Sequence, residues 1–216
     1  PTPARAGVPT MFIVRDNRKV STIIADDGET LTELKLARRG SEFKGTLDVL
    51  CYRGVAKRLR NLEYVSVYNC GLRSLNGMGY LASTPLRRLN LGSNALGEAA
   101  ADGSDPLRDL KSLPALEELW LEGNGLRACS NAFQFLTALR VLRLSNNALG
   151  SLALPDEGEH VDGGAPGEWI ATLSALEELA VDSNGLAALP PSICSLKVLR
   201  SLVARNNALT ALPAPL

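Results

Sequence analysis

The sequence predicts an α/β solenoid with a parallel sheet on its concave face and short helices or turns on its convex face. The first observation is the spacing of a recurring segment, whose starts are 24, 30, 23, 37 and 23 residues apart, a base period of 23 to 24 residues with two insertions. The second is that apolar and variable residues alternate inside each segment, as in a short strand with one buried face. The third is the pattern L-x-x-L-x-L-x-x-N-x-L, which recurs with mild substitution from Leu62, Leu86, Leu116, Leu139, Leu176 and Leu199.

Residues 1–30 are expected to form a β cap at the start of the solenoid. Residues 12–14 and 22–24 are rich in β-prone side chains, and Asp16-Asn17 between them suits a turn. A cap is needed because the first repeat of a solenoid otherwise exposes an apolar end.

Residues 31–216 are expected to form the repeat domain. The segment LTELKLARRGSEF from Leu31 fits a degenerate seventh copy of the pattern. At the other end, the side chains of Leu209, Leu212 and Leu216 are followed by no polar cap, so we expect the chain to be truncated at its C-terminus.

The segments between the strands must return along the convex side. Two of them are lengthened by stretches rich in glycine, proline and acidic residues, at about 98–106 and 155–168, which are expected to be surface loops. The longer one is either a tolerated insertion or an acidic contact arm. The apolar residues expected to form the convex core are Phe133, Leu136, Trp169, Ile170 and Leu173.

The asparagine of each copy is expected to stabilise the turn that leaves the strand. Its carboxamide can pair with buried backbone groups of neighbouring turns, each of which would cost about 1–3 kcal/mol if left unpaired. Cys70 takes this position in one copy, as a small buried group. A ladder of hydrogen bonds is therefore predicted along Asn94, Asn124, Asn147, Asn184 and Asn207.

These segments resemble the leucine-rich-repeat family, and the resemblance covers residues 31–216. LPPSICSLKVL is similar to the linker of the typical repeats, and GLRSLNGMGYLASTPL is similar to the shorter repeats of the phosphatase-regulator type. The run from ELKL through GLRSL to LRRLNLGSNAL also resembles the acidic nuclear phosphoprotein family. The resemblance implies an intracellular α/β leucine-rich-repeat solenoid that binds other proteins.

The variable strand positions point away from the leucines and form the concave surface. Their charges alternate in sign from copy to copy, so ion pairs between adjacent strands are one explanation for them. Trp120 lies between Leu119 and Leu121 on an outward position, which is typical of an interface anchor, with a structural stack on Arg143 as the alternative. The partner-binding residues are therefore expected to be Tyr64, Tyr68, Arg88, Asn90, Trp120, Glu122, Arg143 and Arg205.

The sequence favours neither an enzyme nor a cofactor site. His160 is the only histidine, so no Ser-His-Asp or Cys-His arrangement and no ordinary zinc site can be assembled. The cysteines form no CxxC pair and are expected to be free thiols of a reducing compartment. A formal net charge of zero and the lack of a long apolar segment argue against nucleic-acid and membrane partners.

Three functions fit this sequence. We expect a non-catalytic intracellular module, cytoplasmic or nuclear, that binds a protein partner through its concave face. The first alternative is a regulatory subunit of a phosphatase, a small GTPase or a ubiquitin ligase, which would place the chain in a larger complex. The second alternative is an extracellular recognition domain.

Overall fold

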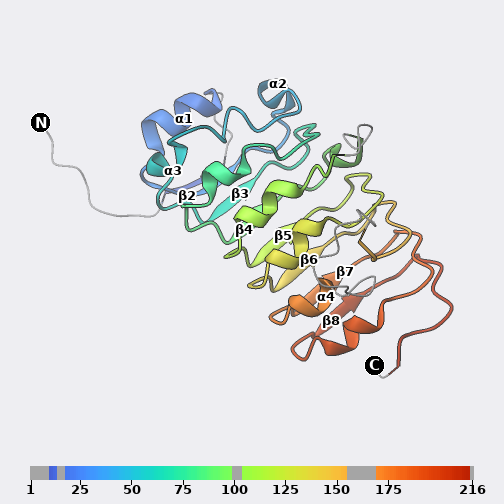
Figure 1. Cartoon of the computed structure of the whole chain (residues 1–216). Helices are drawn as coiled ribbons and strands as arrows, with labels where there is room; N and C mark the ends of the chain where they lie inside the picture. The colour runs from blue at the N-terminus through green and yellow to red at the C-terminus, as the bar shows by residue number, and fades with distance from the viewer. Residues whose placement is uncertain (1–9, 14–17, 99–103, 155–168, 215–216) are drawn as a thin grey trace, which may run out of the picture.

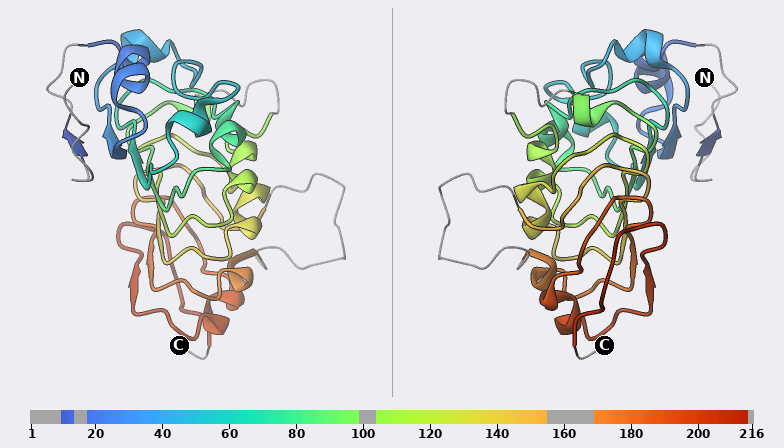
Figure 2. Two further views of the ribbon diagram at one scale, coloured as in Figure 1. Left: turned by 90° about the vertical axis from the view of Figure 1, so that its left-hand side faces the viewer. Right: turned by 90° about the vertical axis from the view of Figure 1, so that its right-hand side faces the viewer.

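The computed structural model describes residues 10–13, 18–98, 104–154 and 169–214. In these residues eight short strands form one parallel sheet, in which the strands follow one another in chain order (Figure 1). Turned by 90°, the molecule shows the strands on one side and a column of short helices on the other (Figure 2). The architecture is therefore the α/β solenoid that the sequence predicts.

The bounds of the elements show how short each one is. The strands are β1 (Thr10–Ile13), β2 (Leu31–Lys35), β3 (Tyr64–Ser66), β4 (Arg88–Asn90), β5 (Glu118–Trp120), β6 (Val141–Arg143), β7 (Glu178–Ala180) and β8 (Ser201–Val203). The α-helices are α1 (Val20–Asp27), α2 (Gly40–Phe43), α3 (Val55–Arg58) and α4 (Trp169–Thr172). The 3₁₀ helices are η1 (Met78–Leu81), η3 (Arg108–Ser112), η4 (Asn131–Phe135) and η5 (Pro191–Ser195).

A single row of buried side chains fixes the register of the sheet. The central residue of each strand pairs with that of the next, as Leu89 does with Leu119 and Leu119 with Leu142, and all three are fully buried. A shift by one residue would turn these leucines to solvent, at about 1.5–3 kcal/mol for each. The repeat pattern therefore determines which side chains face outward.

The convex core is built from the residues that the sequence predicts. Phe133 of η4 and Trp169 of α4 are buried, and their ring centroids lie 5.2 Å apart. The indole Nε1 of Trp169 donates to the backbone oxygen of Leu152 at 2.7 Å, so its polar group is satisfied inside the core. Leu136, Ile170 and Leu173 are buried as well.

The turn that leaves each strand needs a residue with left-handed backbone. The residue just before the ladder position has φ between 52° and 64° in six successive copies. Glycine adopts this conformation freely, and asparagine does so more readily than most other residue types. The residues are Asn69, Ser93, Gly123, Asn146, Ser183 and Asn206.

The predicted hydrogen-bond ladder is present. The Oδ1 atom of Asn147 accepts from the backbone N–H groups of Asn124 (3.0 Å) and Leu126 (3.1 Å). Its Nδ2 group donates to the backbone oxygens of Leu121 (3.0 Å) and Leu144 (2.7 Å). One side chain thus joins the turns of two successive repeats.

At the two insertions only the donor half of this ladder continues, from the Nδ2 groups of Asn124 and Asn184 to the backbone oxygens of Leu91 and Leu144. The Oδ1 atoms of Asn124 and Asn184, the first ladder residues after each insertion, are buried and accept no hydrogen bond from the described residues. In the preceding repeats, Gly97 and Gly150 instead donate their N–H groups to the backbone oxygens of Asn124 and Asn184, both at 2.9 Å. A Cβ atom on Gly97 would lie 1.9 Å from the backbone oxygen of Gly125, so glycine is required there. Residues 99–103 and 155–168 lie outside the described residues, so the two loops remain predictions.

The strand expected over residues 22–24 is wrong, because these residues lie in helix α1. Val20, Ile23 and Ile24 are buried at helical spacing, and burial of this face outweighs the β propensity of single residues. The carboxylate of Glu42 accepts from the backbone N–H of Val20 at 2.8 Å and so holds the first turn. Strand β1 pairs in parallel with β2, and we propose that β1 and α1 together serve as the cap.

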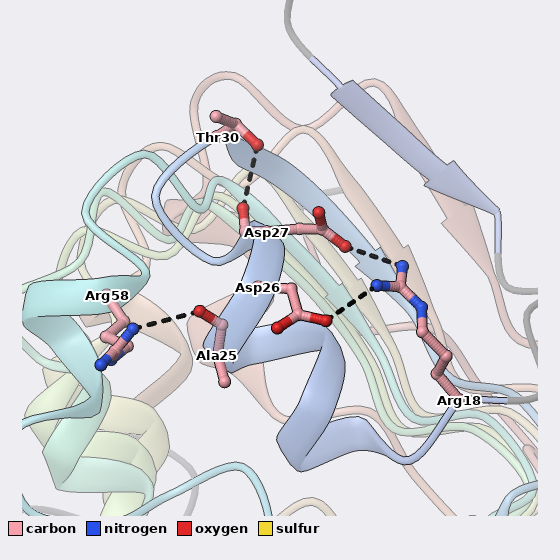
Figure 3. A network of polar contacts seen from close by, with 6 residues as sticks. All are labelled: Arg18, Ala25, Asp26, Asp27, Thr30 and Arg58. Carbon is pink, nitrogen blue, oxygen red and sulfur yellow. Dashed lines mark hydrogen bonds and ion pairs between the residues drawn. The ribbon is translucent and has the colours of Figure 1, made fainter. Parts of the chain in front are cut away.

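Polar contacts tie the end of α1 to its surroundings (Figure 3). The guanidinium of Arg18 binds the carboxylates of Asp26 (3.2 Å) and Asp27 (2.7 Å). Arg58, from α3, donates to the backbone oxygen of Ala25 at 3.1 Å, and Thr30 donates to that of Asp27 at 2.9 Å. The helix is thereby joined both to the segment before it and to the next repeat.

Strand β8 is expected to exchange its amide hydrogens faster than the central strands. All three of its side chains are only partly buried, and Leu212 beyond it is 65% exposed. Local opening at such an edge costs less free energy than opening in the core. Hydrogen exchange read by mass spectrometry should show peptides from 200–208 exchanging before peptides from 118–126, and equal protection of the two would contradict this.

Candidate functional site

Two rows of side chains cover the sheet surface that faces away from the short helices, which we call the concave face. They flank the buried central residue of each strand and are aligned by the strand register. The first row contains Tyr64, Arg88, Glu118, Val141, Glu178 and Ser201. The second row contains Ser66, Asn90, Trp120, Arg143, Ala180 and Val203.

A third row lies just beyond the strands, before the left-handed residues. Backbone hydrogen bonds align its members. The residue that follows one member donates its N–H to the backbone oxygen of the member in the next repeat, as Asn69 does to Gly92 and Gly123 does to Ser145. This row contains Tyr68, Gly92, Glu122, Ser145, Asp182 and Arg205.

An open hollow of about 610 Å³ lies where the second and third rows meet, over β4 to β6. Five of the eight residues predicted to bind a partner line it: Tyr68, Asn90, Trp120, Glu122 and Arg143. The other residues that line the hollow, which the sequence reasoning missed, are Ser93, Gly123 and Asn146. All three are left-handed turn residues, and their recurrence as Asn, Ser or Gly was the signal that could have identified them.

The remaining predicted residues lie outside this hollow. Tyr64 and Arg88 belong to the first row, where the Arg88 guanidinium carbon lies 4.8 Å from the centroid of the Tyr64 ring. Arg205 follows β8 and lies in the third row with an exposed side chain. The structure therefore divides the predicted set into a central group of five and three residues around it.

Much of the alternating charge links strands to one another. Arg88 of β4 binds Glu33 of β2 at 2.9 Å, and Arg143 of β6 binds Glu178 of β7 at 2.9 Å. Such ion pairs at a surface contribute about 0–1 kcal/mol each, so they fix side-chain positions more than they stabilise the fold. The expectation of ion pairs between adjacent strands is confirmed for Arg143 and Glu178, whereas Arg88 and Glu33 lie on strands that β3 separates.

Trp120 faces away from Leu119 and Leu121, as the pattern predicts, but its ring is only partly exposed. It meets the Tyr64 ring edge to face, with centroids 6.0 Å apart. Such a pair contributes about 0.5–1.5 kcal/mol beyond the burial of area. Trp120 therefore contributes to folding as well as to the concave surface, through its contact with the Tyr64 ring of β3.

Glu122 is the least compensated charge in the hollow. Its side chain is partly buried, and it forms no ion pair with any residue of the described ranges. Burial raises the pKa of this carboxyl above its usual value, and the charge of Glu178 adds to the effect. Its own backbone N–H and Arg143 act in the opposite direction and are outweighed.

The Glu122→Gln variant should be more stable than the wild type at pH 7, and the difference should shrink at about pH 4. A folded-state pKa above the unfolded value contributes stability that is complete below the unfolded pKa and is lost as pH rises through the folded pKa. The amide keeps the shape of the side chain and has no such dependence. Urea denaturation at both pH values measures it, and a Gln variant that is weaker at pH 7 would show that the carboxylate stabilises the fold.

Two buried cysteines are not activated as nucleophiles. Burial raises the pKa of Cys51 and of Cys129 to about 12, so both remain protonated thiols. Over the described ranges, no group of three His, Cys, Asp or Glu residues is placed to hold a metal ion. No helix within them has the length and apolar character needed to cross a membrane. His160 lies outside the described residues.

Comparison with known proteins supports the repeat assignment. No protein-family model matches the chain. The acidic leucine-rich nuclear phosphoprotein 32-related protein 2 of Caenorhabditis elegans is 36% identical over 105 residues, which is 48% of this chain and 43% of that protein. The chain therefore spans less than half the length of this relative.

Solved structures show the same fold. A leucine-rich-repeat protein of Leptospira interrogans superposes with a TM-score of 0.59 and 23% identity, over 86% of this chain and 45% of its own. An internalin of Listeria monocytogenes superposes with a TM-score of 0.59 and 19% identity, over 89% of this chain and 46% of its own. At these identities the likeness establishes the architecture alone.

Proposed function

We propose that this leucine-rich-repeat solenoid is a non-catalytic interaction module that binds a protein partner through its concave face. The observation that carries the proposal is the hollow over β4 to β6, which an exposed Tyr68 and a partly exposed Trp120 line beside the ion-paired Arg143 and the carboxylate of Glu122, which is unpaired among the described residues. Trp, Tyr and Arg are the residues most enriched among the energetic anchors of protein interfaces. An open sheet surface with such anchors suits a protein surface better than an enclosed small molecule.

The partner is proposed to be intracellular, cytoplasmic or nuclear. All four cysteines are free thiols, as expected in a reducing compartment. The similarity to a nuclear phosphoprotein-related protein agrees with this location. A regulatory subunit in a larger complex would use the same surface and is the alternative form of the proposal.

Affinity capture with two double variants tests this function. Immobilised wild-type chain should retain a protein from an extract of its source cells, and Tyr68→Ala with Trp120→Ala should lose it. Tyr80→Ala with Phe135→Ala is the matched control, because these aromatic side chains are 51% and 48% exposed on η1 and η4. Retention by the concave-face variant together with loss by the helix-side variant would place binding on the other surface.

A further inference from the structure

The charges around the hollow are unevenly balanced. In the three rows from β5 to β7, four carboxylates stand against one guanidinium, that of Arg143. Arg143 is already bound to Glu178 at 2.9 Å. Glu118 and Glu122 lie two residues before and two residues after Trp120. Neither of them forms an ion pair with another described residue. The region therefore holds a surplus of negative charge beside the partly exposed ring of Trp120.

The aromatic walls of the hollow are fixed in position. Tyr68 is 39% exposed, and its ring lies so close over Gly92 that a Cβ atom there would be 3.2 Å from the Tyr68 Cδ2 atom. Trp120 is held by its edge-to-face contact with Tyr64. Both rings keep an exposed surface toward the hollow, and an aromatic face attracts a cation within about 6 Å of its centroid.

The same sheet already contains one complete example of this chemistry. On β2 to β4, the Arg88 guanidinium lies 4.8 Å from the Tyr64 centroid and binds the Glu33 carboxylate at 2.9 Å. Lys35 adds a second cation, 5.3 Å from the same ring and 2.8 Å from Glu33. A tyrosine ring and a carboxylate there hold internal basic side chains.

We propose that the hollow formed by Tyr68, Trp120 and Glu122 receives a basic side chain, arginine or lysine, from the surface of the protein partner. This rests on the proposed function and names the chemistry of its partner. The hollow repeats the aromatic and carboxylate components of the Tyr64 site, while Arg143, the one cation that lines it among the described residues, is bound to Glu178.

Charge complementarity selects a cation over an anion. Further burial of Glu122 by a partner would be costly unless an opposite charge accompanied it. An incoming carboxylate would meet Glu122 and Glu118, and its attraction to Arg143 would have to compete with Glu178. A bound cation would lower the pKa of Glu122, so binding should strengthen as pH rises through that pKa.

A nuclear magnetic resonance titration of the whole chain tests the proposal without the partner. The probe is Nα-acetyl-arginine amide, with the citrulline amide as its uncharged analogue and the glutamate amide as the anionic one. The indole N–H of Trp120 reports on the hollow, and that of Trp169, which is 3% exposed and bonded to Leu152, is the internal reference. The arginine probe should shift the Trp120 signal saturably and leave Trp169 in place.

Charge should account for the binding. The citrulline amide and the Glu122→Gln variant should each weaken the titration by about fivefold or more, as expected when a charge-assisted contact is lost. Glu63→Gln, a change of an exposed carboxylate outside the three rows, should leave it unchanged. Equal binding of arginine and citrulline, a shift by the glutamate amide alone, or no shift at all would each overturn the proposal.

Failure of this inference can be distinguished from failure of the proposed function. A captured partner that requires Tyr68 and Trp120 but binds Glu122→Gln as tightly as the wild type would contradict the basic side chain and leave the concave face as the binding surface. A partner whose affinity is unaffected by Trp120→Ala would contradict the proposed function itself.

Discussion

Replacement of Asn147 with alanine should lower the free energy of unfolding by about 3 kcal/mol. Its Oδ1 atom accepts from two backbone N–H groups and its Nδ2 group donates to two backbone oxygens. The four donor–acceptor distances are 2.7–3.1 Å, and the groups belong to two successive turns. Alanine removes all four bonds and leaves groups that are largely shielded from water. Urea denaturation followed by circular dichroism measures the loss.

Asn124→Ala is the matched control for this prediction. The Nδ2 group of Asn124 donates to the backbone oxygens of Leu91 and Leu121, but its Oδ1 atom accepts nothing from the described chain. Its replacement should therefore cost about half as much. Equal losses in the two variants would show that the acceptor half of the carboxamide contributes little and that the ladder explanation is wrong.

Trp120→Ala should weaken partner binding by about 2 kcal/mol, or roughly thirtyfold in Kd, as loss of a central aromatic anchor does. It should also cost about 1 kcal/mol of stability, because the contact with the Tyr64 ring is lost. Titration calorimetry with the captured partner gives the first quantity and thermal unfolding gives the second.

Phe135→Ala is the control, since this ring is 48% exposed on the helix side and its loss should leave the affinity unchanged. A Trp120→Ala variant that melts several degrees lower while it binds normally would identify Trp120 as a core residue. The assignment of the binding surface would then have to be abandoned.

The sequence predicted the sheet well, because the buried leucines repeat with a spacing that only stacked strands satisfy. It also predicted the ladder, since an asparagine recurs at one position of the repeat, from which the carboxamide can reach two turns, as that of Asn147 does. The helix over Val20–Asp27 was missed because Ile23 and Ile24 favour strands individually, while their burial against the first repeat decides the outcome.

The details of the site were harder to predict. Ion pairing across strands depends on how far each side chain reaches. The sequence pattern does not tell which arginine pairs with Glu178, or that Glu122 has no arginine partner among the described residues. The loss of the acceptor bonds at Asn124 depends on how the chain returns after the insertion. The contact between Trp120 and Tyr64 joins strands 56 residues apart in sequence, which no local pattern reports.

The central claim, that the concave face contacts the partner, is tested most directly by photo-crosslinking. Benzoylphenylalanine replaces either Tyr68 on the concave face or Phe135 on the helix side, two aromatic positions of similar exposure, 39% and 48%. Irradiation of the complex should join the partner to the chain from position 68 and not from position 135. Crosslinking from position 135 alone would contradict the account.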